Sequence, residues 1–392
     1  MSAAERVLVV NAGGGSLKLS LLAADDELID GEAIDAAPDS DEARSALRDF
    51  LDRIGPVDAV GHRVVHGGAE LSRHAELTGA DGARVLAALE VAAELAPLHV
   101  PPALAAIRIC LDALPDVPQV ACLDTVFHAD LPEAARVDPL PAAWRDRFGL
   151  RRYGFHGLSY TWAVRRAAAL LDRPVERLDL VLTHLGSGAS VCAVRGGRSV
   201  WCSMGFTPLE GLPMMTRSGS VDPGLVLWLL QQGGLSVDEV ADGLEHAAGL
   251  TALSRGLSGD TRVLVEAAGG GPWGDPAGDH RPDERDAARL ALEVYSLRVR
   301  QHLAAAAACL PRLDAVVFTG EIGADQPEIR AAVCEGLAVL GLGDALDPAR
   351  NAAAIDTDEV LTRPDAPIPV VLVQPREDRQ IAAETRAVVR PG

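Results

Sequence analysis

The sequence predicts an α/β protein built from two similar halves, and two observations carry this prediction. The chain has 392 residues, more than one hydrophobic core usually serves, so two domains are expected. An apolar strand, a glycine-rich turn and an alternating strand occur in that order twice, at 5–22 and at 180–194. Glycines leave backbone N–H groups uncovered, so such turns suit phosphate oxygens. Two such hairpins half a chain apart indicate a duplicated fold with phosphate bound between the halves.

The composition limits the classes of partner. A net charge of −20 argues against nucleic acid or an anionic membrane, and it requires that an anionic substrate meet locally focused arginines. Six cysteines without CxxC spacing are predicted to be buried free thiols of a reducing compartment. The first residues lack the pattern of a signal peptide, and no apolar run approaches ~20 residues. We therefore expect a globular, cytoplasmic protein.

The first hairpin carries two polar candidates. Asn11 stands at the mouth of its turn and can offer an oxygen to a metal ion, and Lys18, the only lysine of the chain, lies just beyond. The competing interpretation is an ordinary hairpin tip. The second hairpin has His184 before the turn Gly186-Ser187-Gly188, and this repetition favours the phosphate-binding interpretation.

Three further side chains are candidates for chemistry, each with a structural alternative. Arg63 in GHRVVHGG is either presented into a cleft by a strand end or exposed on the surface. Asp124 follows an apolar strand, where open α/β sheets place their chemistry, but a helix N-cap is an equal alternative. His156 in RRYGFHG lies between glycines that permit close ligand approach, or is a structural histidine.

A long irregular segment, 203–222, holds Arg217 between glycines. It is poor in charge and rich in Gly, Pro and Met, which favours an active-site wall over a linker. The remaining chain is read as alternating helices and strands. Helices are expected at 42–54, 82–95, 102–114, 161–171, 283–309 and from 327, strands at 117–123, 314–319 and 369–373, and a terminal helix from 377.

Taken together, these segments resemble the acetate and propionate kinase family. The matching blocks, in consistent order from 7 to 385, are GHRVVHGG, DTVFH, RRYGFHG, HLGSG, SMGFTPLEGL, TRSGSVDP, DAVVFTG, EIRAAVCEGL and IAAET. The resemblance implies the duplicated two-domain acetate/sugar kinase–Hsp70–actin (ribonuclease H-like) fold. It implies an N-terminal acyl- and metal-binding domain at 1–125 plus 377–392, and a C-terminal nucleotide-binding domain at 126–376. It also implies a homodimer.

The activity that the resemblance implies is reversible transfer of the γ-phosphoryl group of ATP to acetate, giving acetyl phosphate and ADP, with Mg²⁺ (or Mn²⁺) as cofactor. Two anions must meet in this reaction, so positioning and charge neutralisation dominate, and guanidinium groups suit both. The family's catalytic residues match Arg63, Asp124, His156 and Arg217. Its acyl-binding residues match Arg63, Val65, Leu98, Phe155 and Pro208. Its nucleotide-binding residues match Lys18, His184, Leu185, Gly186, Ser187, Gly188, Asp260, Thr261, Arg262, Glu321, Ile322, Gly323, Ala324 and Asp325. Its metal-site residues match Asn11 and Glu377.

Departures from the family pattern gather on the donor side. The family usually has serines at Gly14 and Gly15, asparagine at Ser187 and glycine at Glu321. Glu321 adds bulk and negative charge where adenosine is expected. Two alternatives to ATP-dependent acetate phosphorylation therefore remain: the same reaction with another phosphoryl donor such as pyrophosphate, or a non-catalytic paralogue of the family. The acyl pocket suggests two or three carbons without separating acetate from propionate.

Overall fold

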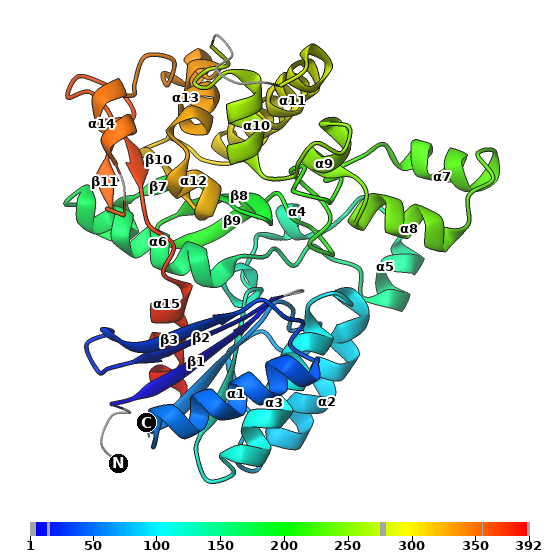
Figure 1. Ribbon diagram of the computed structural model, residues 1–392, viewed down its shortest axis with the longest axis vertical. Helices are drawn as coiled ribbons and strands as arrows, with labels where there is room; N and C mark the ends of the chain where they lie inside the picture. The colour runs from blue at the N-terminus through cyan, green and yellow to red at the C-terminus, as the bar shows by residue number, and fades with distance from the viewer. Residues whose placement is uncertain (1–4, 14–15, 275–279, 355, 390–392) are drawn as a thin grey trace.

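The structure, a computed structural model, describes residues 5–13, 16–274, 280–354 and 356–389. It contains two six-stranded mixed sheets, one from each half of the chain, with helices on their faces (Figure 1). None of the helices in these ranges is long and apolar enough to cross a membrane.

The first sheet has the strand order β3-β2-β1-β4-β6-β5. Its strands are β1 (Val7–Ala12), β2 (Leu17–Leu22), β3 (Leu28–Ile34), β4 (Ala59–Val64), β5 (Ala75–Glu76) and β6 (Gln119–Leu123). The second sheet has the order β11-β12-β10-β7-β8-β9. Its strands are β7 (Asp179–Leu185), β8 (Ala189–Arg195), β9 (Arg198–Cys202), β10 (Ala315–Thr319), β11 (Glu359–Val360) and β12 (Val370–Leu372).

The two sheets have the same topology, strand for strand. In each, the first three strands form an antiparallel meander, the first strand pairs in parallel with the fourth, and a short antiparallel strand closes the far edge. The two predicted glycine-rich hairpins are β1–β2 and β7–β8, at equivalent places. The predicted duplication is therefore confirmed.

Helices cover both faces of each sheet and meet between them. The α-helices are α1 (Asp41–Ile54), α2 (Gly82–Ala92), α3 (Val100–Ala113), α4 (Glu133–Arg136), α5 (Ala142–Phe148), α6 (Gly157–Leu170), α7 (Pro223–Gln231), α8 (Val237–Glu245), α9 (Gly249–Leu253), α10 (Thr261–Ala268), α11 (Pro282–Ala307), α12 (Glu321–Asp325), α13 (Pro327–Glu335), α14 (Pro348–Ala353) and α15 (Glu377–Val389). Short 3₁₀ turns are Ala93–Leu95, Val126–His128, Val175–Arg177 and Ala338–Leu340. The last helix, α15, returns to the first sheet and packs on α6 between the two sheets (Figure 1).

The alternation of β1 shows how its sheet buries two faces. Leu8, Val10 and Ala12 belong to the core under α1 and α3, whereas Val7 and Val9 pack with Ile381 of α15. The approach of α15 is close, because a Cβ atom at Gly61 of β4 would lie 2.2 Å from Oγ1 of Thr385. A glycine in the GHRVVHGG block therefore lets the terminal helix seat on the first sheet.

Two local expectations differ from the structure. The polar segment before residue 58 contains, besides the predicted helix, the strand β3, which was not predicted and whose only buried residue is Ile34. An edge strand exposed on both faces lacks the apolar alternation that would have indicated it. The strand predicted at 314–319 is followed by the short helix α12, which was not predicted and which begins at Glu321 after Gly320 with φ of 81°. All six cysteines are free thiols, five buried and Cys309 exposed.

Three buried histidines make stability dependent on pH. Burial lowers the pKa of His62, His66 and His128 to about 4. Between pH 6.5 and 4 the unfolded chain therefore binds protons that the folded chain excludes, so stability falls as pH falls. We expect a loss of up to about 1.4 kcal/mol per pH unit for each histidine in this window. Chemical unfolding at pH 7.5, 6.5 and 5.5 measures it, and His62→Gln should reduce the slope. Equal slopes in the native chain and this variant would contradict the assignment.

Candidate active site

The main cavity is lined by Gly13 of the first hairpin and by Gly186, Ser187 and Gly188 of the second. It has a volume of about 730 Å³ and takes side chains from both halves of the chain. The sequence-predicted residues that line it are Asn11, Lys18, Arg63, Val65, Asp124, Phe155, His156, His184, Gly186, Ser187, Gly188, Pro208, Arg217, Glu321 and Glu377. All four residues predicted as catalytic thus lie on one cavity.

Arg63 and Asp124 form an ion pair at the ends of two neighbouring strands. Arg63 stands in β4 directly beside Asn11 of β1, and Asp124 follows β6. Nε and Nη2 of Arg63 donate to Oδ2 of Asp124 at 3.1 and 2.8 Å, and Nη1 donates to Oδ1 of Asn11 at 3.3 Å. The carboxylate of Glu377 lies 3.8 Å from Nε of Arg63. Arg63 is therefore not a surface arginine. The carboxylate of Asp124 pairs with Arg63 and also accepts a hydrogen bond from the backbone N–H of Leu158 in the first turn of α6, so the helix-capping role and the ion pair occur together.

The charged groups of this cluster shift one another's pKa values. Burial alone lowers the pKa of Arg63, but Asp124 and Glu377 outweigh it and raise that pKa. Burial raises the pKa of Asp124 to about 6, with Arg63 opposing and Glu377 adding to the rise. Burial raises the pKa of Glu377, but Arg63, His184, Lys18 and a hydrogen bond from Asn11 lower it overall. At neutral pH the cluster therefore holds two carboxylates against one guanidinium.

One buried carboxylate oxygen without a normal hydrogen bond, together with neighbouring oxygen donors, marks a place for a cation. Oδ1 of Asp124 is buried and accepts no hydrogen bond of normal geometry from the described residues. Glu377 and the amide oxygen of Asn11 line the same cavity. In the described part of the chain no three His, Cys, Asp or Glu side chains enclose a metal. Oxygen donors that leave coordination positions open fit Mg²⁺, which usually keeps waters and binds substrate phosphates.

Arg217 differs from Arg63 in having no carboxylate partner among the described residues. It extends from the irregular segment 203–222, and its Nη1 donates to the carbonyl of Pro208 at 2.8 Å. Burial lowers its pKa to about 10, so it remains a cation at neutral pH. A Cβ atom at Gly188 would lie 3.0 Å from Nη2 of Arg217 and 3.2 Å from Nε2 of His156. The absence of a side chain at Gly188 thus lets the turn Gly186-Ser187-Gly188 approach both side chains.

Two histidines stack face to face on this turn. The rings of His156 and His184 have centroids 4.1 Å apart with 20° between their planes. Nδ1 of His156 is 2.8 Å from Oγ of Ser190, and Nδ1 of His184 is 2.8 Å from Oγ of Ser159. Burial lowers the pKa of both histidines, and the positive charges nearby lower that of His156 further. Both rings are therefore neutral at neutral pH.

The apolar lining of the cavity differs from the prediction at Leu98. Val65, Phe155 and Pro208 line the cavity, but Leu98 does not, and its neighbour His99 does. His99 comes just before α3, and burial together with Arg217 and Arg63 lowers its pKa to about 3. Sequence reasoning missed His99, although a polar residue between two apolar ones ahead of a helix start could have drawn attention to it.

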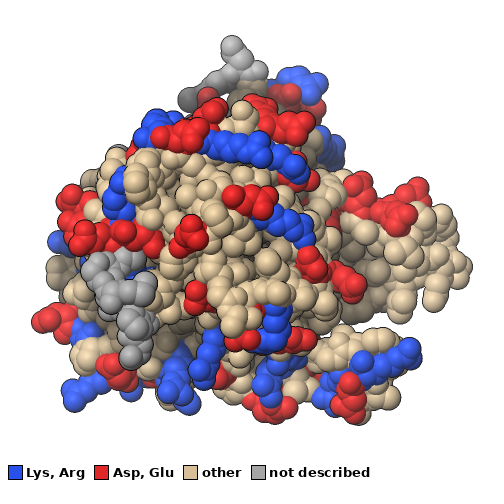
Figure 2. Space-filling view, turned by 90° about the horizontal axis from the view of Figure 1, so that it is seen from below, with Lys and Arg blue, Asp and Glu red and all other residues tan. Residues whose placement is uncertain are grey.

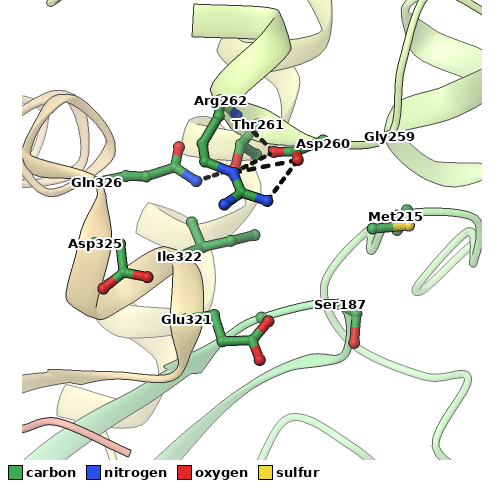
Figure 3. A pocket seen from close by; sticks show the side chains of 11 residues that line it. Ser187, Met215, Gly259, Asp260, Thr261, Arg262, Glu321, Ile322, Asp325 and Gln326 are labelled. Atoms are coloured by element: carbon green, nitrogen blue, oxygen red, sulfur yellow. Dashed lines mark hydrogen bonds and ion pairs between the residues drawn. The ribbon is translucent and has the colours of Figure 1, made fainter. Parts of the chain in front are cut away.

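A second cavity of about 340 Å³ adjoins the first and shares Gly186, Ser187 and Glu321 with it. Its other predicted residues are Asp260, Thr261, Arg262, Ile322 and Asp325. Arg262 bonds to Asp260 on one side, Glu321 and Ser187 lie opposite, and Ile322 projects between them (Figure 3).

Three residues predicted to bind the nucleotide, Leu185, Gly323 and Ala324, are buried and line neither cavity. The predictions for Gly14 and Gly15 lie outside the described residues. Met215 and Gln326 line the 340 Å³ cavity and were not predicted.

Known proteins have sequences and folds similar to those of this chain. The model of the Acetokinase family matches residues 46–383. The chain belongs to the acetokinase family. An acetate kinase of Geobacillus kaustophilus is 38% identical over 408 residues, covering 97% of this chain and 98% of that protein. An acetate kinase of a Synechococcus strain is 45% identical over 333 residues, covering 85% and 77%.

Solved structures agree with the family assignment. The crystal structure of Porphyromonas gingivalis acetate kinase superposes with a TM-score of 0.84 at 29% identity, covering 98% of this chain and all of that one. A propionate kinase of Francisella tularensis gives 0.85, also at 29% identity, with the same coverage. The acetokinase fold expected from the sequence motifs is therefore confirmed.

Proposed function

We propose that this member of the acetokinase family transfers the γ-phosphoryl group of ATP reversibly to acetate, forming acetyl phosphate and ADP. Membership of the family makes the chain a phosphotransferase with a carboxyl group as acceptor. The observation that carries the proposal is a cavity with two arginines in different states. Arg63 is compensated by carboxylates, whereas Arg217 has no such partner among the described residues and remains free to bind an anion.

In this proposal the side chains neutralise and align the two anions. Arg217 and Arg63 hold the acceptor carboxylate and the transferring phosphoryl group by forked, charge-assisted hydrogen bonds. If Nδ1 of His156 accepts from Ser190, its Nε2 carries the hydrogen and donates to a phosphoryl oxygen. A carboxylate oxygen of acetate attacks the γ-phosphorus, and the bond to the β–γ bridging oxygen breaks as ADP leaves. Val65, Phe155 and Pro208 surround the methyl group.

We assign a divalent cation, Mg²⁺ or Mn²⁺, to the oxygens of Asp124, Asn11 and Glu377, directly or through water. When bound, it neutralises phosphate charge during transfer. The orphaned Oδ1 of Asp124 supports this assignment.

We assign the nucleotide to the 340 Å³ cavity, with its phosphates along Gly186–Gly188 and Lys18 towards the acceptor. This places the donor in the second half of the chain, as expected of a nucleotide-binding domain at 126–376. The packing of α15 on the first sheet supports an acyl- and metal-binding domain at 1–125 plus 377–392.

An assay of acetyl phosphate formation tests the function. Purified protein with Mg²⁺ and acetate is offered ATP, GTP or pyrophosphate, and acetyl phosphate is trapped as the hydroxamate. We expect ATP to act as the phosphoryl donor, because a cavity is present in the proposed nucleotide site even with Glu321 in its lining. Turnover with pyrophosphate alone would support the alternative donor, and no turnover with any of the three would favour the non-catalytic paralogue. Propionate in place of acetate measures the acyl preference.

We further propose that the chain forms a homodimer through the arm made of α7 and α8. This arm projects from the second half of the chain (Figure 1), and α7, with the sequence PGLVLWLLQ, has no buried residue. Leu225, Leu227, Trp228 and Val237 are 48–70% exposed on it. Elsewhere, on the face that Figure 2 presents, acidic and basic side chains are interspersed. An apolar surface of this kind usually marks an interface, and the family resemblance makes a second copy the partner.

Trp228→Glu should convert the dimer to a monomer, because it places a charge in an apolar interface. Light scattering after size exclusion measures the mass. Val339→Glu is the matched control, because Val339 is 86% exposed but outside the arm. A native protein with the mass of one chain at micromolar concentration would refute the dimer, and a Trp228→Glu variant that stays dimeric would refute the arm as its interface.

A further inference from the structure

An ion pair between the two halves of the chain lies at the mouth of the cavity. Nζ of Lys18, on β2, lies 3.2 Å from Oε1 of Glu321, the first residue of α12. Lys18 is exposed between the buried Leu17 and Leu19, so the alternation of β2 directs it away from the core. Both side chains are more than half exposed, 57% and 66%. The contact is therefore a solvent-exposed ion pair at the entrance of the cleft.

Glu321 stands where the two cavities meet. With Gly186 and Ser187 it lines both the 340 Å³ cavity assigned to the nucleotide and the 730 Å³ cavity that holds the reacting groups. Its side chain faces Ser187 across the opening (Figure 3). A phosphate chain that extends from one cavity to the other must pass between these residues. The carboxylate thus lies beside the path of the donor's negative charge.

Three cations around this path are already paired, whereas Arg217, Arg376 and Arg379, which also line the main cavity, form no ion pair with a carboxylate in the described part of the chain. Arg262 is paired with Asp260, Arg63 with Asp124, and Lys18 with Glu321. An incoming phosphate chain therefore meets Lys18 with its charge already balanced, and also meets the repulsion of Glu321.

We propose that Glu321 sets the affinity for the phosphoryl donor by competing with its phosphates for Lys18. The proposal rests on the proposed function only in taking the donor to be a polyphosphate. Without donor, Lys18 bridges the cleft to Glu321. When the donor binds, its phosphate oxygens replace the carboxylate as partner of Lys18, and Glu321 turns to solvent. Glu321 is thus a specificity-determining residue that weakens binding of highly charged donors.

Replacing Glu321 with glutamine tests the proposal. Glu321→Gln keeps the shape and removes the charge, so the KM for MgATP should fall about three- to tenfold. The KM for acetate should stay unchanged, because Glu321 is absent from the apolar part of the cavity. The KM for MgATP should also rise more steeply with salt in this variant, because an attraction is no longer offset. Glu335→Gln, which removes an exposed charge at the end of α13, is the matched control.

A double-mutant cycle separates competition for Lys18 from a general field effect. In the native background Lys18→Gln removes a cation that is partly occupied, whereas in Glu321→Gln it removes a free one. We therefore expect the loss of donor affinity on Lys18→Gln to be at least threefold larger in the Glu321→Gln background. Equal losses in the two backgrounds, or a KM for MgATP that is unchanged or raised in Glu321→Gln, would overturn the proposal.

Direct binding keeps this test independent of turnover. In titration calorimetry, MgADP or pyrophosphate is titrated into the native chain and each variant without acetate. The dissociation constants then give the same double-mutant cycle of Lys18→Gln and Glu321→Gln. If the native chain forms no acetyl phosphate, the proposed function fails, but tighter binding by Glu321→Gln still supports the competition. If turnover is robust and calorimetry shows unchanged binding in Glu321→Gln, the competition alone fails. Thermal unfolding of each variant confirms that the folds are equivalent.

Discussion

Arg217→Ala should reduce kcat at least about 10³-fold. Arg217 is a buried cation of the cavity that forms no ion pair with a carboxylate of the described residues, although Glu245 lies close enough to raise its pKa. Arg217 lies against the Gly188 turn beside His156. Its guanidinium is therefore available to the charge that develops during transfer, where such an interaction contributes several kcal/mol. Initial rates of acetyl phosphate formation, with ATP and acetate varied separately, measure the loss.

The control for this variant is Arg195→Ala, which removes an exposed arginine at the far end of β8. It should behave as the native chain does. Arg217→Lys should remain impaired, because an ammonium cannot make the forked contact, and added guanidinium should partly restore Arg217→Ala. Near-native kcat in Arg217→Ala would show that the cavity has been assigned wrongly.

Asp124→Asn should lower kcat about 10²- to 10³-fold and remove an acidic limb of the pH profile. The carboxylate of Asp124 accepts two hydrogen bonds from Arg63, and its Oδ1 accepts none of normal geometry from the described residues in the cavity where we propose the cation site. Burial raises the pKa of Asp124 to about 6. The native rate should therefore fall as pH drops through about 6, because protonation removes the charge that both partners need.

Asp314→Asn is a matched control, because Asp314 pairs with Arg173 and Arg312 at the opposite end of the second sheet. It should leave kcat and the pH profile unchanged. A limb near pH 6 that persists in Asp124→Asn would assign the titration to another group. Raising Mg²⁺ should recover part of the Asp124→Asn activity if the lost oxygen binds the cation.

The sequence by itself determined the duplicated α/β plan, because glycine-rich turns between apolar strands are local signals and occur at equivalent places of both sheets. Local patterns made Arg63, Asp124 and His156 candidates with structural alternatives and placed Arg217 in an active-site wall, and the family resemblance then implied catalytic roles for all four. The sequence did not indicate β3, an edge strand without apolar alternation, or His99, which a helix start far from the motifs brings to the cavity.

Only the tertiary structure decided which charges balance one another. Arg63 and Arg217 are both arginines beside glycine-rich motifs, yet Asp124 holds the first, whereas the second donates to the carbonyl of Pro208 and pairs with no carboxylate among the described residues. Lys18 and Glu321 are 303 positions apart and form an ion pair across the cleft. Local propensity acts over a few residues, whereas Coulomb attraction and desolvation depend on distance in space and on burial. The state of each charged group therefore follows from how the two halves close, which no local pattern contains.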